Sequence, residues 1–416
     1  WRMDVDGSNI TRISNIAGNS WGLGISEDFE LFASSANKVP AQHIHVPYPY
    51  FDAVGLKKQH ALPIFDSHTF YPLTITRQGD NFGSYTAAAG FDIYTARTFP
   101  HEFWNKTAFI GAPTGKLLGQ FHIEPDNNGS YLAINGGSFM ASFDERTAPI
   151  QGKTGPDGNL YIIDWHNLIM LHGGELDNPL RDKSHGRIYR ISHKRGRSSK
   201  PLNLKNATSD ELVDNLKNEN MLWRIMAQKK LVQENRMDAI PELIKMAKDP
   251  SLDGIRSNPA VIHALWTLHG LGQMDGLNKK ALSVAHAALK HSSSAVRKNA
   301  VRVLPATLES TRLLANMLDE QDANTLRYIL LTLSIMPKNE ALGQRIYSIG
   351  QQIKGKNGLT SPYQLALVRH GTTLIEKLIT EIPERNREME GVVDILEPEL
   401  INILQSAVKK PAFGVI

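Results

Sequence analysis

The chain has 416 residues and no cysteine, which excludes disulfides, thiol catalysis, iron–sulfur clusters and covalently attached haem within these residues. Hydrophobic residues make up 41% and charged residues 21%, a composition typical of a globular protein. The length of the chain predicts two or three domains. The formal net charge of +4 is too small to favour nucleic-acid binding. The basic residues are scattered except for one run, His193 to Arg197, which is expected to be a solvated linker. No apolar run predicts a transmembrane segment.

Residues 1–192 are predicted to form β-structure, because short apolar runs alternate with Gly, Asn, Asp and Pro. The sequence opens at Trp1 as if at the end of a strand, so we expect a chain cut inside a domain, and its lack of a signal peptide does not locate the parent protein. The expected strands are Phe29 to Ser34, Ala108 to Gly111, Leu117 to Ile123, Leu160 to Asp164 and Ile188 to Ile191.

A weak repeat within this half predicts the blades of a β-propeller. Trp21 to Ser26 leads through a turn at Glu27 and Asp28 into a strand, and Thr154 to Gly158 leads in the same way into Asn159 to Asp164. Each pattern is typical of an inner strand, a rim turn and a second strand, and Gly186 to Ile191 is expected to be the outer strand of the last blade. Roughly three blades are too few to close a ring, which again predicts a domain truncated at its N-terminal side.

After a linker at 193–207, the period becomes helical over 208–383. Thr208-Ser209-Asp210-Glu211 is a helix start signal. A motif with a small residue followed by Leu four positions later then recurs at intervals of 37 and 36 residues, with a shorter last interval. A helix-pair repeat of roughly 35–45 residues predicts a HEAT-like α-solenoid. The copies are Arg224-x-x-Ala227-x-x-x-Leu231, Val261-x-x-Ala264-x-x-x-Leu268, Arg297-x-x-Ala300-x-x-x-Leu304 and, loosely, Arg327-x-x-Leu330. Their Arg and Leu positions are expected to serve packing, and the segment 384–416 is expected to be truncated.

Several histidines in the β half are candidates for a metal-binding or ligand-binding site. His43 and His45 are spaced to place both rings on one side of a strand, and His68 follows in the same loop-rich region. The pair could bind a metal or lie on a propeller face, but the sequence supplies no further ligands at defined spacing, and ordinary surface or core histidines remain the alternative.

The segment that follows Leu160 to Asp164 carries a second set of candidates. Asp164 and His166 emerge directly from the expected strand, and a long loop then leads to a polar cluster that contains Arg181, Asp182, His185 and Arg187. Carboxylate, imidazole and guanidinium groups together could bind an anionic cofactor, a divalent ion or a sugar. The alternative is that Asp182 and Arg187 form an ion pair that only fixes the loop.

The segment from Thr154 to Trp165, followed by His185 to Arg190, resembles the last blade of the membrane-bound dehydrogenase-like proteins of planctomycetes, verrucomicrobia and bacteroidetes. Asp6-Gly7 with Asn19 to Leu23 resembles an earlier stretch of the same family, and Asn220 to Leu231 and Ala264 to Gly272 resemble its first two HEAT repeats. The resemblance extends over roughly residues 1–310 and places two unrelated sets of motifs in the family's order.

The resemblance implies a periplasmic or secreted protein with a propeller similar to glucose/sorbosone dehydrogenases. Such a protein would oxidise a sugar or alcohol with pyrroloquinoline quinone and calcium, and pass electrons to a haem c domain absent from this chain. On this hypothesis Asp164, His166, His185 and Arg187 are the expected catalytic residues, and His43, His45, His68, Arg181 and Asp182 the expected cofactor contacts. The alternative is a non-catalytic scaffold whose propeller binds a glycan or protein and whose HEAT surface docks a peptide or another domain.

Overall fold

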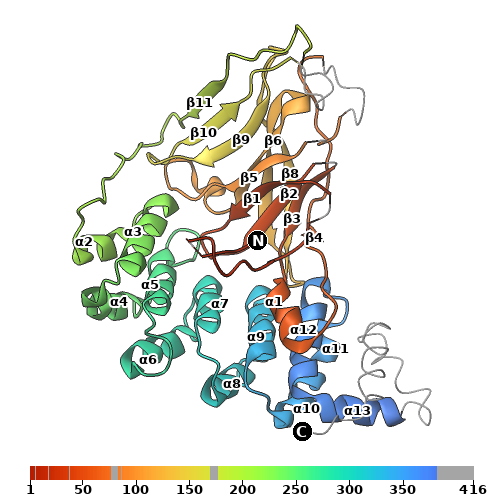
Figure 1. Ribbon diagram of the computed structural model, residues 1–416, viewed down its shortest axis with the longest axis vertical. Coiled ribbons are helices and arrows are strands. Elements are labelled where there is room, and N and C mark those ends of the chain that lie inside the picture. Colours follow the sequence, from red (N-terminus) through yellow and green to blue (C-terminus); the bar gives the residue numbers. More distant parts are fainter. Residues whose placement is uncertain are drawn as a thin grey trace.

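The computed structural model describes residues 1–381, except for 5, 17, 37, 76–82, 86 and 169–176, and only the backbone of 378–381. Sheets occupy the N-terminal half and helices the C-terminal half, and in Figure 1 the helices form a row beneath the sheets. No helix within this described part is long and apolar enough to cross a membrane. The expected segment 384–416 lies outside the described residues.

The β half contains three antiparallel sheets in which strands follow each other in chain order. Their strands are β1 (Ser20–Ile25), β2 (Leu31–Ser35), β3 (Val39–His43) and β4 (Leu62–Pro63); β5 (Ala89–Ile93), β6 (Thr107–Ala112), β7 (Leu117–Pro125) and β8 (Tyr131–Ala141); and β9 (Pro149–Thr154), β10 (Leu160–Asp164) and β11 (Arg187–Ile191). The five strands expected from the sequence are therefore all present, and β11 is the edge strand of the last sheet, as predicted.

The first strands of the three sheets lie beside one another, β1 against β5 and β5 against β9. Glycines permit this approach, because a Cβ on Gly22 would come within 2.4 Å of the backbone nitrogen of Phe91. A Cβ on Gly90 would likewise come within 2.8 Å of the carbonyl oxygen of Ile150. Phe91 thus fills the space between the first two sheets, and it is fully buried.

The helical half is a stack of helix pairs. Its helices are α2 (Ser209–Asn215), α3 (Met221–Gln233), α4 (Ile240–Met246), α5 (Pro259–Gly270), α6 (Lys279–Ala288), α7 (Ser294–Arg302), α8 (Leu308–Ala315), α9 (Ala323–Ile335), α10 (Gly343–Ser348), α11 (Gly350–Ile353), α12 (Asn357–His370) and α13 (Thr372–Glu381). Consecutive helices pack as pairs, and α3, α5, α7, α9 and α12 form a continuous row, the arrangement on which solenoids are built.

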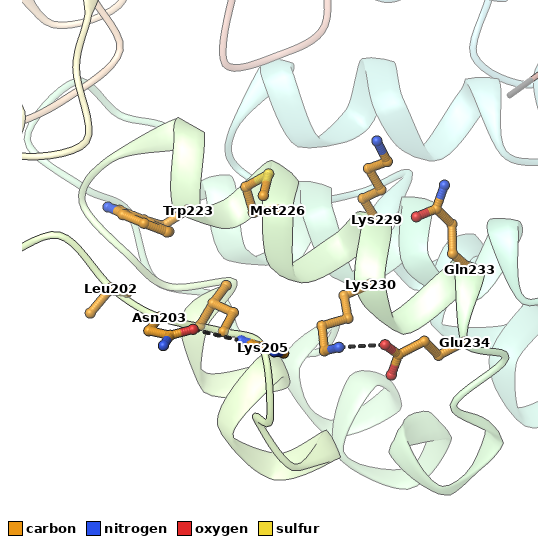
Figure 2. Close-up of a pocket in the computed structure, with 10 residues that line it drawn as sticks. Leu202, Asn203, Lys205, Trp223, Met226, Lys229, Lys230, Gln233 and Glu234 are labelled. Carbon is orange, nitrogen blue, oxygen red and sulfur yellow. Dashed lines mark hydrogen bonds and ion pairs between the residues drawn. The ribbon is translucent and has the colours of Figure 1, made fainter.

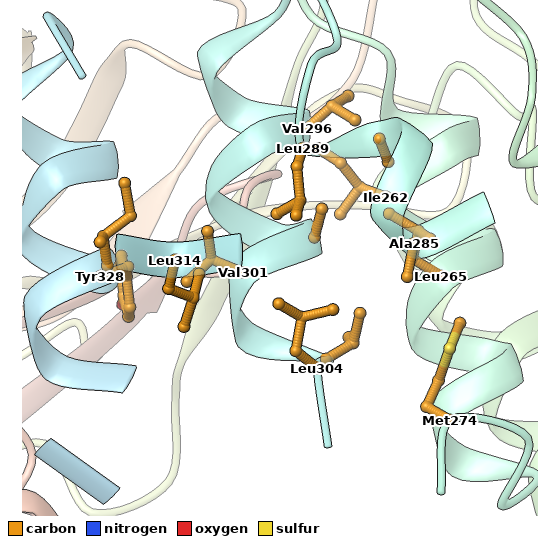
Figure 3. Packing of buried hydrophobic residues seen from close by; sticks show 14 of the residues in the cluster. Ile262, Leu265, Met274, Ala285, Leu289, Val296, Val301, Leu304, Leu314 and Tyr328 are labelled. Carbon is orange, nitrogen blue, oxygen red and sulfur yellow. The ribbon is translucent and has the colours of Figure 1, made fainter. Parts of the chain in front are cut away.

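The helix start at Thr208 is confirmed. The Thr208 side chain accepts from the backbone N–H of Glu211, and the Glu211 carboxylate accepts from the backbone N–H of Thr208, which completes a capping box. The recurring small residues Ala227, Ala264 and Ala300 are fully buried in α3, α5 and α7. Figure 3 shows the apolar side chains that α5 to α9 pack together around this row.

One helix of the N-terminal half departs from the expected β-structure. α1 (Tyr48–Val54) begins after Pro47 and ends at Gly55, whose φ of 76° suits a residue without a side chain. Its Tyr48 and Phe51 are buried in the core of the helical half, where α1 packs against α9 and α12. The two halves therefore share a core, and sequence periodicity did not anticipate this because α1 is only two turns long.

Candidate functional site

The best candidate site lies at one end of the last sheet, where β10 and β11 pair in antiparallel register. That register sets Asp164 opposite Arg187. Residues from four separate segments meet there, and we call them the Asp164 cluster: Asp144, Asp164, His166, Asp182, His185, Arg187 and Tyr189.

Asp164 is the buried anchor of this cluster, with 1% of its surface exposed. One carboxylate oxygen accepts from the backbone N–H groups of Ala148 and His166, at 2.6 and 2.8 Å, and the other accepts from the Tyr189 hydroxyl at 3.1 Å. These bonds fix the chain as it leaves β10. They also hold His166 at a φ of 52°, a backbone conformation that is uncommon for residues other than glycine.

Arg187 joins the two sides of the cluster. Its guanidinium donates to Asp144 at 2.9 Å and to the Tyr189 hydroxyl at 3.3 Å, and it lies 3.4 Å from His166 Nε2. The hydrogen bonds that Arg187 donates to Tyr189 and to Asp144 raise the pKa of Arg187. The alternative interpretation, an Asp182–Arg187 ion pair, is therefore wrong, because the carboxylate that Arg187 binds is that of Asp144.

His166 contributes an unsatisfied polar atom. A guanidinium can only donate, so the contact with Arg187 makes Nε2 of His166 the acceptor and leaves the proton on Nδ1. His166 is 8% exposed, and its buried Nδ1 has no hydrogen-bond partner among the described residues. A buried donor without a partner costs about 1–3 kcal/mol, so this N–H is a natural contact for a ligand oxygen.

Asp182 and His185 form the exposed end of the cluster. Asp182 accepts from the backbone N–H groups of Ser184 and His185, and the first of these bonds is the main reason that its pKa is well below the usual value. His185 Nδ1 lies 2.9 Å from the same carboxylate. The carboxylate therefore orients the His185 ring through Nδ1, on a side chain that is 71% exposed.

The sequence-predicted residues thus separate into groups. Asp164, His166, Asp182, His185 and Arg187 come together, and the Arg181 guanidinium lies 5.8 Å from the centre of the Trp165 ring beside them. His68 lies elsewhere, in edge-to-face contact with Phe65. The cluster residues that the sequence analysis missed are Tyr189, which shares a strand face with Arg187, and Asp144, for which the sequence offers no local signal.

His43 and His45 occupy a different environment, the interface between the sheets and the helices. They are 0% and 2% exposed, and their rings lie 6.3 Å apart. His43 contacts Glu30 and Arg327, at 3.2 and 2.9 Å. Burial, followed by the Arg327 charge, lowers the pKa of His43 to about 4, so the ring is neutral at pH 7.

The turn between β1 and β2 places three acids against the helix row at this interface. We call the set the interdomain ion network: Glu27, Asp28 and Glu30 on the turn, with Arg97, Arg224, Lys298 and Arg327. Glu27 binds Arg224 at 2.6 Å and Arg97 at 2.7 Å. Glu30 binds Arg327 at 2.5 Å and Lys298 at 2.6 Å.

Each acid of the network is paired with at least one cation of the chain itself. Burial alone would raise the pKa of Glu30, but Arg327 and Lys298 outweigh it and hold that pKa well below its usual value. Phe29, at the tip of the turn, lies edge-to-face against His263 and Trp266 of α5. Arg224 and Arg327, expected to serve packing, instead bind the acids of the other half. The side of the helix row that faces the sheets is therefore occupied by the chain itself (Figure 1).

The described residues do not assemble a metal site, since no group of three or more His, Asp or Glu side chains among them could hold an ion. The Asp164 cluster has three carboxylates against one guanidinium, and protein donors occupy both oxygens of Asp164. This set does not fit a quinone with several carboxylates, which would require an excess of positive charge. A neutral, hydroxyl-bearing ligand is compatible with it.

Comparisons with known proteins found a family model that is similar to the β half of the chain. A family model described as a domain of unknown function (DUF7133) matches residues 1–195. No curated protein matches the chain. Among solved structures, the complex of CpcE and CpcF of phycocyanin lyase from Nostoc sp. PCC7120 is similar at 16% identity and a TM-score of 0.30, over 44% of this chain and 75% of that chain.

Proposed function

We propose that residues 1–191 are a sector of a β-propeller, joined to a HEAT-type solenoid, and that the Asp164 cluster binds a neutral polyhydroxylated ligand, a sugar or alcohol. The three meander sheets with adjacent first strands support the propeller assignment. The observation that carries the ligand proposal is the buried Nδ1–H of His166, which lacks a partner among the described residues beside a guanidinium and a carboxylate.

The ligand chemistry follows from the charges of the cluster. Sugar hydroxyls both donate and accept, so they can satisfy carboxylate oxygens and the His166 N–H at the same time. Asp144 and Asp182 would accept from hydroxyls, while His166 and Arg187 would donate to ring or hydroxyl oxygens. Trp165 is 41% exposed next to the cluster and offers an apolar surface of the kind that pockets for organic ligands require.

The enzymatic form of this proposal is oxidation of a sugar or alcohol hydroxyl in a periplasmic or secreted dehydrogenase-like protein. His185 is then the residue that accepts the hydroxyl proton at Nε2, because Asp182 orients its ring through Nδ1. The reaction also needs a two-electron acceptor. The resemblance to membrane-bound dehydrogenase-like proteins implies that this acceptor is a quinone, which residues outside the Asp164 cluster would have to hold. It also implies that a haem c domain outside this chain receives the electrons.

The non-catalytic alternative retains the ligand and omits the chemistry. It is favoured by the complete pairing of the interdomain ion network, which makes the two halves a rigid scaffold without a free charged group at their interface among the residues named. In this version the chain binds a glycan, or a protein, and His185 has no role beyond contact.

Calorimetric titration of the full chain with aldoses and alditols tests the ligand proposal. His166→Ala and Arg187→Ala should each weaken binding about tenfold or more, which corresponds to loss of about 1.4 kcal/mol. The controls are His60→Ala, an exposed histidine with one side-chain partner, and Arg146→Ala, an exposed arginine close to Asp144. Absence of saturable binding to any sugar, or binding that survives both cluster substitutions, would refute the site.

Dye reduction separates the two forms of the proposal. If the protein is an oxidoreductase, addition of pyrroloquinoline quinone and calcium should produce sugar-dependent dye reduction. His185→Ala should then lower the rate with little change in sugar affinity, and a higher pH should partly restore it. Sugar binding without dye reduction at any quinone concentration would establish the scaffold.

A further inference from the structure

The segment that joins β11 to α2 carries an unusual concentration of positive charge. Between Ser192 and Asn206 it contains five cations and no acidic residue: Lys194, Arg195, Arg197, Lys200 and Lys205. All five are exposed, and within the described part of the chain none of their side chains forms a hydrogen bond or ion pair. These charges are therefore available to a partner.

The backbone that presents them is held in place. The Ser199 N–H donates to the carbonyl oxygen of Asp157 at 3.1 Å, and the Ser198 hydroxyl accepts from Asn159 and Arg190, at 2.8 and 3.1 Å. Gly196 passes so close to the sheets that a Cβ there would lie 2.4 Å from the carbonyl oxygen of Thr98. A pre-ordered backbone lowers the entropy cost of binding, so this segment differs from a loose charged linker.

Two grooves lie along the segment. One, of about 1040 Å³, is bounded by Phe99 and Pro100 on one side and by His193 to Arg197 on the other, and Glu102 and Glu219 also line it. The second, of about 540 Å³, lies between Leu202 to Lys205 and one face of α3.

The second groove combines apolar and cationic side chains. Figure 2 shows Leu202 and Lys205 across from Trp223, Met226 and Lys229 of α3. Met226 is 46% exposed and Leu202 37%, and Lys229 forms no ion pair within the described residues. Lys230 and Glu234 of the same groove pair with each other, so its net positive charge comes from Lys205 and Lys229 beside the apolar side chains.

We propose that these two grooves and the basic segment between them form one docking surface for an acidic segment of a partner protein. Its carboxylates would lie along Lys194 to Lys205, and an apolar side chain would enter the groove at Met226. The apolar floor favours a protein over a nucleic acid, because phosphates would contact only the cations and leave Met226 and Leu202 unused. This surface does not depend on the Asp164 cluster, so it can be tested separately.

Fluorescence anisotropy with a labelled acidic peptide, in which glutamates alternate with single leucines, tests the surface on the full chain. Arg195→Glu combined with Arg197→Glu should weaken peptide binding by about tenfold or more at low salt. The matched control is Lys279→Glu with Lys280→Glu, two exposed lysines of α6 remote from the segment, which should change binding less than about twofold if the effect is local.

Met226→Asp tests the apolar contact. It should weaken the leucine-containing peptide and leave unchanged the weaker binding of a version with serine at every leucine. Equal losses in the arginine variant and in the lysine control would overturn the proposal, since they indicate a general charge effect. Tighter binding of a short DNA duplex than of the peptide, insensitive to Met226→Asp, would also overturn it and assign the surface to nucleic acid.

Discussion

Removal of the Glu30 charge is the sharpest test of how the two halves are joined. The Glu30 side chain is fully buried, with Arg327 at 2.5 Å, Lys298 at 2.6 Å, Tyr328 at 3.1 Å and His43 at 3.2 Å. Glu30→Gln retains the shape but removes the negative charge. Lys298 would still bind Asp28, whereas Arg327 would be left as a buried cation without a counter-ion.

Loss of one partner from a buried pair costs about 3–5 kcal/mol, a large part of the roughly 5–15 kcal/mol by which a protein is stable. Urea denaturation followed by circular dichroism and by tryptophan fluorescence should therefore show a lower midpoint for Glu30→Gln. The control is Asp214→Asn, which breaks an exposed pair with Lys217 and should cost less than about 1 kcal/mol.

A double-mutant cycle isolates the pair itself. Arg327→Met should recover much of the loss when it is introduced into Glu30→Gln, because the uncompensated cation is then gone. The reasoning is refuted if Glu30→Gln costs no more than Asp214→Asn, or if the two substitutions are simply additive.

Three further predictions concern single positions. The pKa of His43 is about 4 in the folded protein, whereas that of a histidine in the unfolded chain is about 6.5. The stability contributed by the neutral ring is therefore present above pH 6.5 and is lost as the pH falls toward 4. The free energy of unfolding should fall by about 2 kcal/mol between pH 7 and 5, and denaturation curves of His43→Gln should lack this pH-dependent component. Gly22→Ala should cost about 1–3 kcal/mol in the same assay, because its Cβ meets the backbone of Phe91, while Gly186→Ala, whose Cβ has 3.7 Å of clearance, should cost far less; equal costs would contradict the close packing of β1 on β5. Thr208→Ala should cost about 1 kcal/mol through loss of the capping box, and Thr208→Ser should restore most of it in a thermal melt, whereas a neutral Thr208→Ala would exclude a stabilising cap.

The interface also changes what the helical half can do. The acids of the β1–β2 turn and the Phe29 ring occupy the side of the helix row that faces the sheets. Of the two occupants expected for the solenoid surface, a peptide or another domain, this side holds a domain of the same chain. A protein partner is more reasonably sought on the opposite or lateral surfaces, such as the basic segment along α3.

Local patterns in the sequence were sufficient wherever structure is decided by neighbours along the chain. Leu160 to Asp164 was predicted as a strand with its observed bounds, because alternation and the preceding Asp157-Gly158 turn act within a few residues. The helix start at Thr208 follows from a capping box that spans four positions. The helix repeat was visible because Ala227, Ala264 and Ala300 each allow a neighbouring helix to approach.

Tertiary structure decided everything that depends on partners far apart in sequence. The sequence predicted one candidate site that contains Asp164, His166, Asp182, His185 and Arg187. Only the tertiary structure shows which of these residues are in contact. The β10–β11 register sets Asp164 opposite Arg187, and the Arg187 guanidinium binds Asp144. His43, expected beside a cofactor, is a neutral member of a buried ion network.

The reason is that an ion pair between residues far apart in the chain produces no periodic pattern in the sequence. Glu30 and Arg327 lie on opposite halves of the chain, and each resembles an ordinary surface charge when it is considered alone. Their burial depends on the docking of the sheets onto the helix row, so the pairing of these charges is decided only once both halves have folded.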